Sequence, residues 1–266
     1  MRHALHLAPF DALADPAALR DIAVAAEATG WDGLFLWDHV YRPEDVTTAI
    51  ADVWIALTVV ATATNRLRLG PMVTPITRRR IATLARQTVT LDHVSAGRLV
   101  VGLGLGVDSG RELTAFGEIV DPKVRAARLD EGAGLLAELW SGERVHHDGP
   151  QYVADDVRMR PVPIQQPRIP LWFAARGSAL APVCRAARYD GLFPIEMDLA
   201  TFQRAVDTVR AERGHLDGFE IAVRVEADID VPAFVAAGAT WAIHPLPPTT
   251  TVKTAMALAG QPPQLD

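Results

Sequence analysis

Short apolar runs alternate with helical segments along almost the whole chain, and this alternation constrains the fold more than any other feature. Runs that read as buried strands occupy 3–7, 34–37, 67–69, 98–102, 170–174, 191–193, 219–225 and 240–243. Helical material follows each run, and eight βα repeats in about 250 residues are the pattern of a (β/α)8 TIM barrel. A doubly wound open sheet is the alternative. That fold more often has a glycine fingerprint after its first strand, and residues 7–10 carry none.

Helix start and stop signals separate the strands. Asp15 and Pro16 predict a helix start, because Asp caps a helix well and Pro fits its first position, and Gly30 predicts the end. Further helices are expected over 53–64, 81–94, 124–140, 178–188, 199–213, 231–237 and 249–260. Segment 141–170 is rich in Pro, Gly and Asp and predicts an insertion with short strands of its own. No linker marks a second domain, so we expect a single domain over 1–266.

The composition permits an enzyme and argues against several other classes. With 266 residues, 49% of them hydrophobic, the chain can bury a large core, yet no run approaches the length of a membrane-spanning helix. The first residues lack the apolar core of a signal peptide, and a single cysteine excludes an intrachain disulfide. These features predict a cytoplasmic protein. The net charge of −6 argues against a broad nucleic-acid surface.

Carboxyl ends of strands carry the functional residues of TIM barrels, and the second strand is followed by Asp38 and His39. A histidine at this position could bind a ligand or move a proton near neutral pH. Asp38 could orient the imidazole ring or stabilise its charge. A structural Asp–His pair that caps the next element is an equally open interpretation.

The third and fourth strands end in segments that could contact a ligand. The third leaves through Gly70–Pro75, whose two prolines stiffen the backbone, so it could form a wall for a flat ring or a plain rigid turn. Gly102, Gly104 and Gly106 follow the fourth strand and allow close approach to the backbone. Their spacing is not a dinucleotide fingerprint, and no Walker lysine follows.

The fifth strand ends in Ala174–Ser178. Arg176 and the backbone N–H groups of a helix start could hold a phosphate, whereas Ser178 by itself could be an ordinary N-cap. Elsewhere, His146–Asp148 lack further spaced ligands, so no metal site is predicted. The sequence also has no GxSxG nucleophile elbow.

Several segments together resemble the luciferase-like monooxygenase superfamily of flavin-dependent oxidoreductases. They lie between about residues 16 and 244, at 27–39, 69–75, 91–106, 128–131, 139–140, 161–163 and 186–191. Each segment is weak alone, and their order and spacing carry the resemblance. It implies a TIM barrel that binds FMN or the deazaflavin coenzyme F420 at its carboxyl face.

The resemblance also implies roles for individual residues. The flavin ring would lie against the exit of the third strand, where relatives often have a non-prolyl cis peptide, here between Met72 and Val73. His39 matches a histidine that contacts flavin or substrate in relatives, and Asp38 stands beside it as the second catalytic candidate. The expected cofactor-binding residues are Met72, Val73, Thr74 and Gly104 at the ring and Ala175, Arg176 and Gly177 at the phosphate. An apolar substrate pocket is expected from Phe10, Trp37 and Phe193.

Two positions depart from the family pattern. Many relatives have two glycines where this chain has Ala174 and Ala175, so the phosphate contacts are expected to differ. F420-dependent sugar-phosphate dehydrogenases carry a catalytic acid just after the glycines of the fourth strand, and Leu105 stands there in our alignment. This difference argues against that particular activity.

The preferred interpretation is a monooxygenase that uses reduced FMN and oxygen on a small organic substrate, with His39 as proton donor or orienting group. F420-dependent hydride transfer and a non-catalytic flavin-binding relative are the alternatives. A cofactor-free hydrolase or lyase would need paired carboxylates or a metal cluster at strand ends, and the sequence offers neither. The resemblance further implies a homodimer, with a separate flavin reductase as a possible partner.

Overall fold

The computed structural model describes residues 1–43, 45 and 47–264, and its main feature is one parallel sheet. The strands of the sheet follow the order β3-β2-β1-β11-β10-β9-β8-β5-β4. Their bounds are β1 Arg2–Leu7, β2 Gly33–Leu36, β3 Arg68–Pro71, β4 Thr74–Pro75, β5 Val101–Gly104, β8 Leu171–Arg176, β9 Gly191–Ile195, β10 Glu220–Arg224 and β11 Trp241–Pro245.

The sheet closes on itself between its two edge strands. β3 and β4 are two parts of one strand, interrupted only by Met72 and Val73. An isolated parallel bridge between Leu69 and Leu99 joins β3 to the residues that lead into β5. Eight strand positions therefore surround one interior, and the predicted TIM barrel is confirmed.

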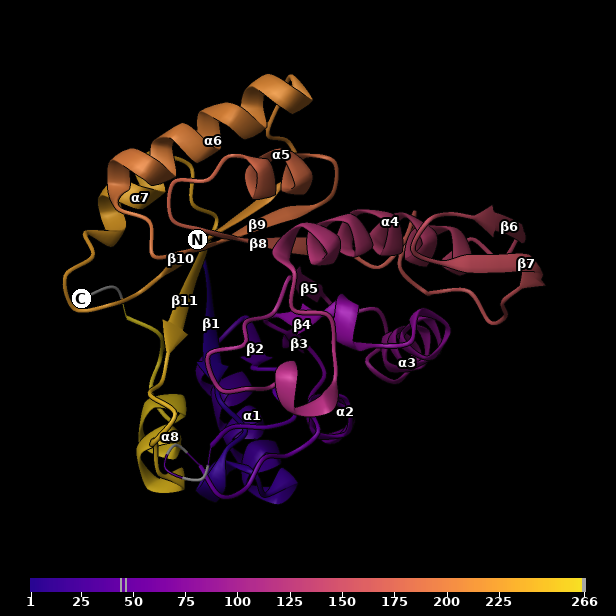
Figure 1. The fold of residues 1–266 in the computed structure, drawn as a ribbon. Coiled ribbons are helices and arrows are strands. Elements are labelled where there is room, and N and C mark those ends of the chain that lie inside the picture. Colours follow the sequence, from indigo (N-terminus) through magenta and orange to yellow (C-terminus); the bar gives the residue numbers. More distant parts are fainter. Residues whose placement is uncertain (44, 46, 265–266) are drawn as a thin grey trace.

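Helices cover the outside of the barrel (Figure 1). They are α1 Pro16–Thr29, α2 Val53–Ala63, α3 Ile81–Val94, α4 Pro122–Trp140, α5 Ala181–Ala187, α6 Leu199–Arg213, α7 Val231–Ala236 and α8 Val252–Ala259, with 3-10 turns η1 Asp11–Leu13, η2 Ile76–Arg78 and η3 Thr114–Phe116. The predicted ends of α1 are confirmed: the Asp15 side chain accepts from the backbone N–H of Ala17, and Gly30 is left-handed.

Most boundaries lie within two residues of those predicted, but β5, α5 and α8 each start three residues later. β5 begins at Val101 rather than at residue 98, because the residues before it pair with β3 only through the isolated bridge between Leu69 and Leu99. α5 begins at Ala181 rather than at residue 178, because a turn intervenes. Ser178 is therefore not its N-cap.

The predicted insertion forms an antiparallel hairpin of β6 Arg144–Asp148 and β7 Val153–Arg158. The Glu131 carboxylate on α4 accepts from the backbone N–H groups of Gln151 and Tyr152, which ties the turn of the hairpin to that helix. The hairpin projects beyond the end of α4, away from the barrel (Figure 1). It is consequently remote from the strand ends at which a TIM barrel binds its ligands.

Side chains that alternate along the strands fill the barrel in layers. Phe35, Trp172 and Trp241 point inward near the amino ends of their strands, with ring centroids 5.6–5.9 Å apart. A second, larger apolar layer packs the outer face of the sheet against the helices. These three rings fill the end of the barrel at which the strands begin. A ligand can therefore enter only from the carboxyl ends of the strands.

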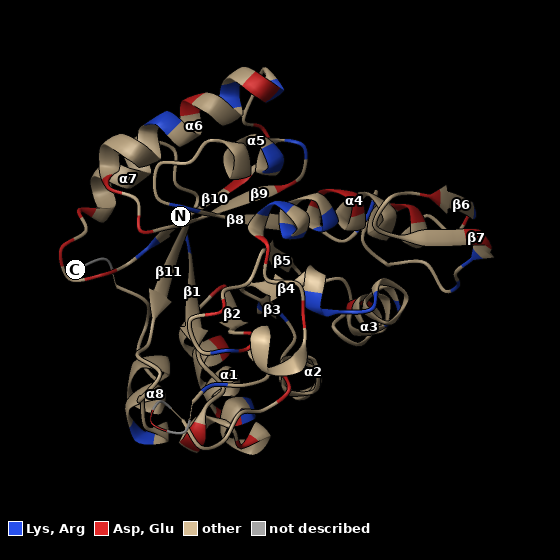
Figure 2. Ribbon diagram, in the orientation of Figure 1, with Lys and Arg blue, Asp and Glu red and all other residues tan. Residues whose placement is uncertain are grey.

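Charged residues lie mainly on the helices and loops, and the strands are largely free of them (Figure 2). Within 1–43, 45 and 47–264, no helix combines the length and the apolar character that crossing a membrane requires.

Candidate active site

A cavity of about 600 Å³ lies at the carboxyl ends of the strands. This size is ordinary for a site that binds a cofactor or small molecule. Residues expected at the site that line the cavity are Trp37, Asp38, His39, Met72, Val73, Gly104, Arg176 and Phe193. Those expected at the site but absent from its lining are Phe10, Thr74, Ala175 and Gly177.

The His39 ring is held by a residue that the sequence did not reveal. Glu112, in the loop between β5 and α4, accepts a hydrogen bond from His39 Nδ1 at 2.9 Å. With Nδ1 engaged in this way, Nε2 is the nitrogen left to exchange a proton with a ligand. No local motif marks Glu112, because its contact with His39 spans 73 residues.

Glu112 is buried, yet its surroundings favour the carboxylate. Burial raises the pKa of its carboxyl group, but the hydrogen bond from His39 and the charges of His39 and Arg78 outweigh burial and lower it. Its other oxygen accepts from the backbone N–H of Val40 at 2.6 Å and from Arg78 Nη1 at 2.9 Å. Glu112 is therefore an anion that fixes both the ring and the backbone beside it.

Asp38 does not orient His39, contrary to the sequence-based expectation. Its carboxylate accepts from Arg78 at 2.9 Å and from Arg79 at 2.7 Å, and Thr74 Oγ1 donates to the same group. All three partners follow the third strand, so Asp38 ties the end of β2 to the exit of that strand. Thr74 is fully buried and engaged with Asp38, which leaves its hydroxyl unavailable to a ligand.

The exit of the third strand provides a surface for a flat ring. The Met72–Val73 peptide is cis, as the resemblance implies. Gly104 faces this segment so closely that a Cβ atom there would stand 2.6 Å from Val73 Cγ2. Glycine at this position lets Val73 keep its place at the wall of the cavity, and the residues present fit a flavin-type ring.

The end of the fifth strand differs in part from the expected phosphate site. Alternation along β8 turns Ala174 into the cavity and Ala175 into the outer apolar layer, so Ala175 cannot contact a ligand through its side chain. The backbone N–H of Gly177 donates to the carbonyl of Ile195. Arg176 reaches the rim, where its Nη1 lies 3.0 Å from Glu196 and both side chains are mostly exposed. Arg176 is thus the only one of the three expected phosphate residues that faces the cavity.

Phe10 lies behind the site rather than in it. It is buried, and its ring stands edge-on to His39 and Trp37 at 5.7 and 6.1 Å between centroids. Its role is to pack against these two rings.

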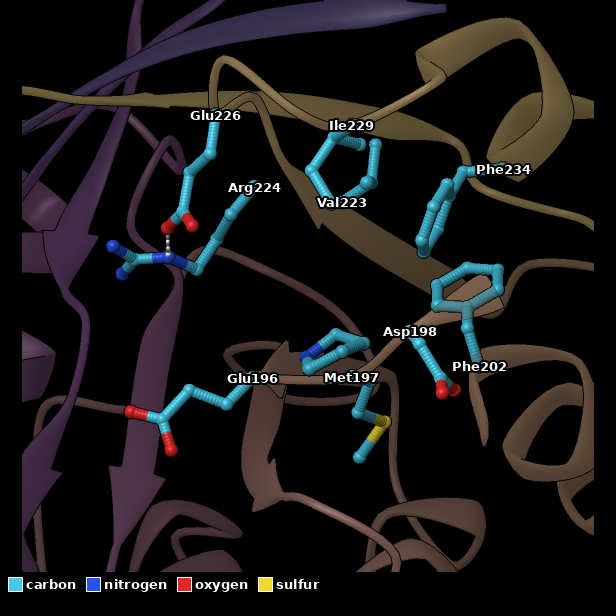
Figure 3. Close-up of a pocket in the computed structure, with 10 residues that line it drawn as sticks. Glu196, Met197, Asp198, Phe202, Val223, Arg224, Glu226, Ile229 and Phe234 are labelled. Carbon is cyan, nitrogen blue, oxygen red and sulfur yellow. Dashed lines mark hydrogen bonds and ion pairs between the residues drawn. The ribbon is translucent and has the colours of Figure 1, made fainter. Parts of the chain in front are cut away.

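A smaller cavity of about 220 Å³ adjoins the main one and shares Glu196, Arg224 and Glu226 with its lining. Figure 3 shows that Arg224 and Glu226 meet at one end, whereas Phe202 and Phe234 face each other at the other end. The Arg224–Glu226 contact, at 2.9 Å, stands where the two cavities meet.

Comparisons with known proteins agree with this geometry. The sequence model of the family described as luciferase-like monooxygenase matches residues 3–239. The F420-dependent glucose-6-phosphate dehydrogenase of Mycobacterium tuberculosis (H37Rv) is 30% identical over 228 residues, which are 81% of this chain and 66% of the relative. The enzyme of the same name from Nakamurella multipartita is 34% identical over 167 residues, 62% of this chain and 48% of the relative. The chain thus spans about half to two thirds of these relatives.

Solved structures show the same fold at low identity. An F420-dependent secondary alcohol dehydrogenase in complex with an F420-acetone adduct has a TM-score of 0.78 at 17% identity, over 98% of this chain and 99% of that one. The monooxygenase RslO1 from Streptomyces bottropensis has a TM-score of 0.74 at 19% identity, over 97% and 98% of the two chains. With the family match over residues 3–239, these findings show that the chain belongs to the luciferase-like monooxygenase family.

Proposed function

We propose that this protein is an oxidoreductase that binds a flavin-type cofactor against Met72 and Val73, and that its first candidate reaction is F420-dependent hydride transfer. The observation that carries the proposal is the His39–Glu112 pair in the same cavity as the Met72–Val73 segment. Proton transfer and a ring-binding surface are the two parts that such a reaction needs. The curated relatives named as F420-dependent dehydrogenases support F420 over the FMN preferred from sequence alone.

The protein's own residues would perform the proton chemistry. F420 held against Met72 and Val73 would supply the acceptor for a hydride from the carbon that bears the substrate hydroxyl. His39 Nε2 would take the hydroxyl proton as the hydride leaves that carbon, so that an alcohol yields a carbonyl compound. The Glu112 carboxylate would stabilise the imidazolium that forms, since it already accepts from Nδ1 at 2.9 Å. Trp37, Met72 and Phe193 would keep water away from the reacting atoms.

A monooxygenase that uses reduced FMN and oxygen is the second candidate. The family description and the fold shared with RslO1 favour it. The same apolar lining would shield an oxygen-reactive cofactor from water, and His39 would then supply rather than accept a proton.

Two spectroscopic titrations of the purified protein, with oxidised F420 and with FMN, test the proposal. We expect saturable binding, tighter for F420, followed by anaerobic loss of the F420 absorbance with an alcohol from a substrate panel. His39→Gln should abolish this turnover without weakening cofactor binding, whereas His215→Gln, an exposed control, should leave both intact. Failure to bind either cofactor would refute the proposed function, and turnover only with reduced FMN and oxygen would favour the second candidate.

A further inference from the structure

His6, on β1, is a buried polar side chain that the mechanism above does not use. It lines the main cavity but is only 2% exposed. Its Nε2 lies 2.9 Å from the carbonyl oxygen of Met72. Because a carbonyl can only accept, Nε2 must carry the proton, and Nδ1 is left with a lone pair.

His6 Nδ1 has no hydrogen-bond partner within the described part of the chain. Burial and, to a smaller extent, the nearby charge of Arg224 lower the pKa of the ring to about 3, so the ring is neutral at physiological pH. Arg224, whose charge acts on His6, donates its Nε–H to Glu226 and makes no hydrogen bond to His6 Nδ1. Buried acceptors are rarely left unpaired, so we expect a bound ligand to supply a hydrogen-bond donor to Nδ1.

Trp37 has an unpaired hydrogen-bond donor close to the ring of His6. Its indole Nε1–H is shielded from solvent and unpaired among the described residues, and Trp37 also lines the cavity. The two ring centroids are 5.9 Å apart. One unpaired acceptor and one unpaired donor therefore belong to neighbouring rings, beside the apolar Met72 and Phe193.

We infer that His6 and Trp37 recognise the N–H/C=O edge of the ring bound in the cavity, with His6 Nδ1 accepting from the ring N–H and Trp37 Nε1 donating to the adjacent carbonyl. This inference rests on the proposed function. FMN and F420 share this pyrimidine edge, so the pair recognises the ring type without choosing between them. Its location fits, because His6 already donates to Met72, the residue against which the ring is proposed to pack.

Blocking the ring N–H provides the test. FMN and its N3-methyl derivative are titrated against the protein by fluorescence; if F420 binds more tightly, 8-hydroxy-5-deazariboflavin and its N3-methyl derivative replace them. The wild-type protein should bind the N–H form about tenfold or more tightly than the methylated form, because methylation leaves the buried acceptor unpaired. In His6→Phe the two forms should bind equally and at the weaker level.

Further variants separate the two halves of the pair. His6→Gln keeps a donor for Met72 and an acceptor for the ring, so it should retain part of the preference. Trp37→Phe should weaken both forms to a similar extent. Trp54→Phe is its matched control, since Trp54 also has an unpaired buried Nε1 among the described residues but does not line the cavity. His3→Phe is the control on β1, at the opposite end of that strand. Each variant is first checked for an unchanged circular dichroism spectrum.

The outcomes keep this inference distinct from the proposed function. If the wild-type protein binds no ring at all, the proposed function fails. If it binds the N–H and N-methyl forms equally, or if His6→Phe keeps the preference, the ring binds but His6 does not recognise its edge. Unchanged ring affinity in His6→Phe together with lost turnover of an alcohol would assign the pair to the substrate and overturn the inference.

Discussion

The neutral His6 ring should make the protein lose stability as the pH falls, and His6→Gln should remove part of that loss. The pKa of His6 is about 3 in the folded protein, against an ordinary value of 6.5 in the unfolded chain. Below pH 6.5 the His6 ring therefore binds a proton in the unfolded state but not in the folded state, so acid favours unfolding. Between pH 7 and pH 5 this difference amounts to about 2 kcal/mol of unfolding free energy from His6 alone.

Urea unfolding at pH 7, 6 and 5 and constant ionic strength measures the effect. The wild-type protein should lose the contribution of His6 together with that of His244, whose pKa burial lowers to about 4. His6→Gln, which can still donate to Met72, should lose about 2 kcal/mol less over the same range. His215→Gln, at an exposed position, should follow the wild type. Equal losses in His6→Gln and the wild type would show that His6 is protonated in the folded protein, and the reasoning would fail.

Three further outcomes can be tested. Glu112→Gln should lower turnover about 10- to 100-fold and alter its pH profile while cofactor affinity holds, because His39 loses its anionic partner; Glu118→Gln, in the same loop, should not. Asp38→Asn should reduce the unfolding free energy in urea by about 3–5 kcal/mol, because the largely buried guanidinium of Arg79 loses its carboxylate partner and that of Arg78 keeps only Glu112. A loss below about 1 kcal/mol would show that these ion pairs do not stabilise the fold. Gly104→Ala should weaken ring binding in the titrations, because the new Cβ atom would displace Val73, against which the ring is proposed to pack. Gly134→Ala, whose new Cβ atom would meet nothing within 4 Å, should stabilise α4 by about 0.5–1 kcal/mol without changing affinity.

Regular elements with strong end signals were predictable from sequence. α3 and α6 have the predicted bounds, because each combines a helical apolar period with clear changes of composition at its ends. The start of β5 differs from the prediction, because it depends on how residues 98–100 pair with β3, about 30 residues earlier in the chain. Local patterns carry no information about such partners.

Site residues that directly follow a strand were predictable from sequence. Site residues that reach the cavity through contacts distant in sequence were not. Strand ends located Trp37, His39 and Met72 in the cavity. The resemblance implies a phosphate contact at Ala175, but two successive alanines do not reveal the phase of side-chain alternation in β8, and it is Ala174 that faces the cavity. Glu112 was missed because its loop has no motif and its partners are distant in sequence.

The double role of Glu112 has a consequence for how the site must work. One carboxylate attaches the loop between β5 and α4 to Val40, to Arg78 and to the His39 ring. A displacement of this loop that withdrew Glu112 would therefore free the His39 ring from its hydrogen-bond partner. Under the proposed function, such a displacement would also remove the group that orients His39 for proton transfer.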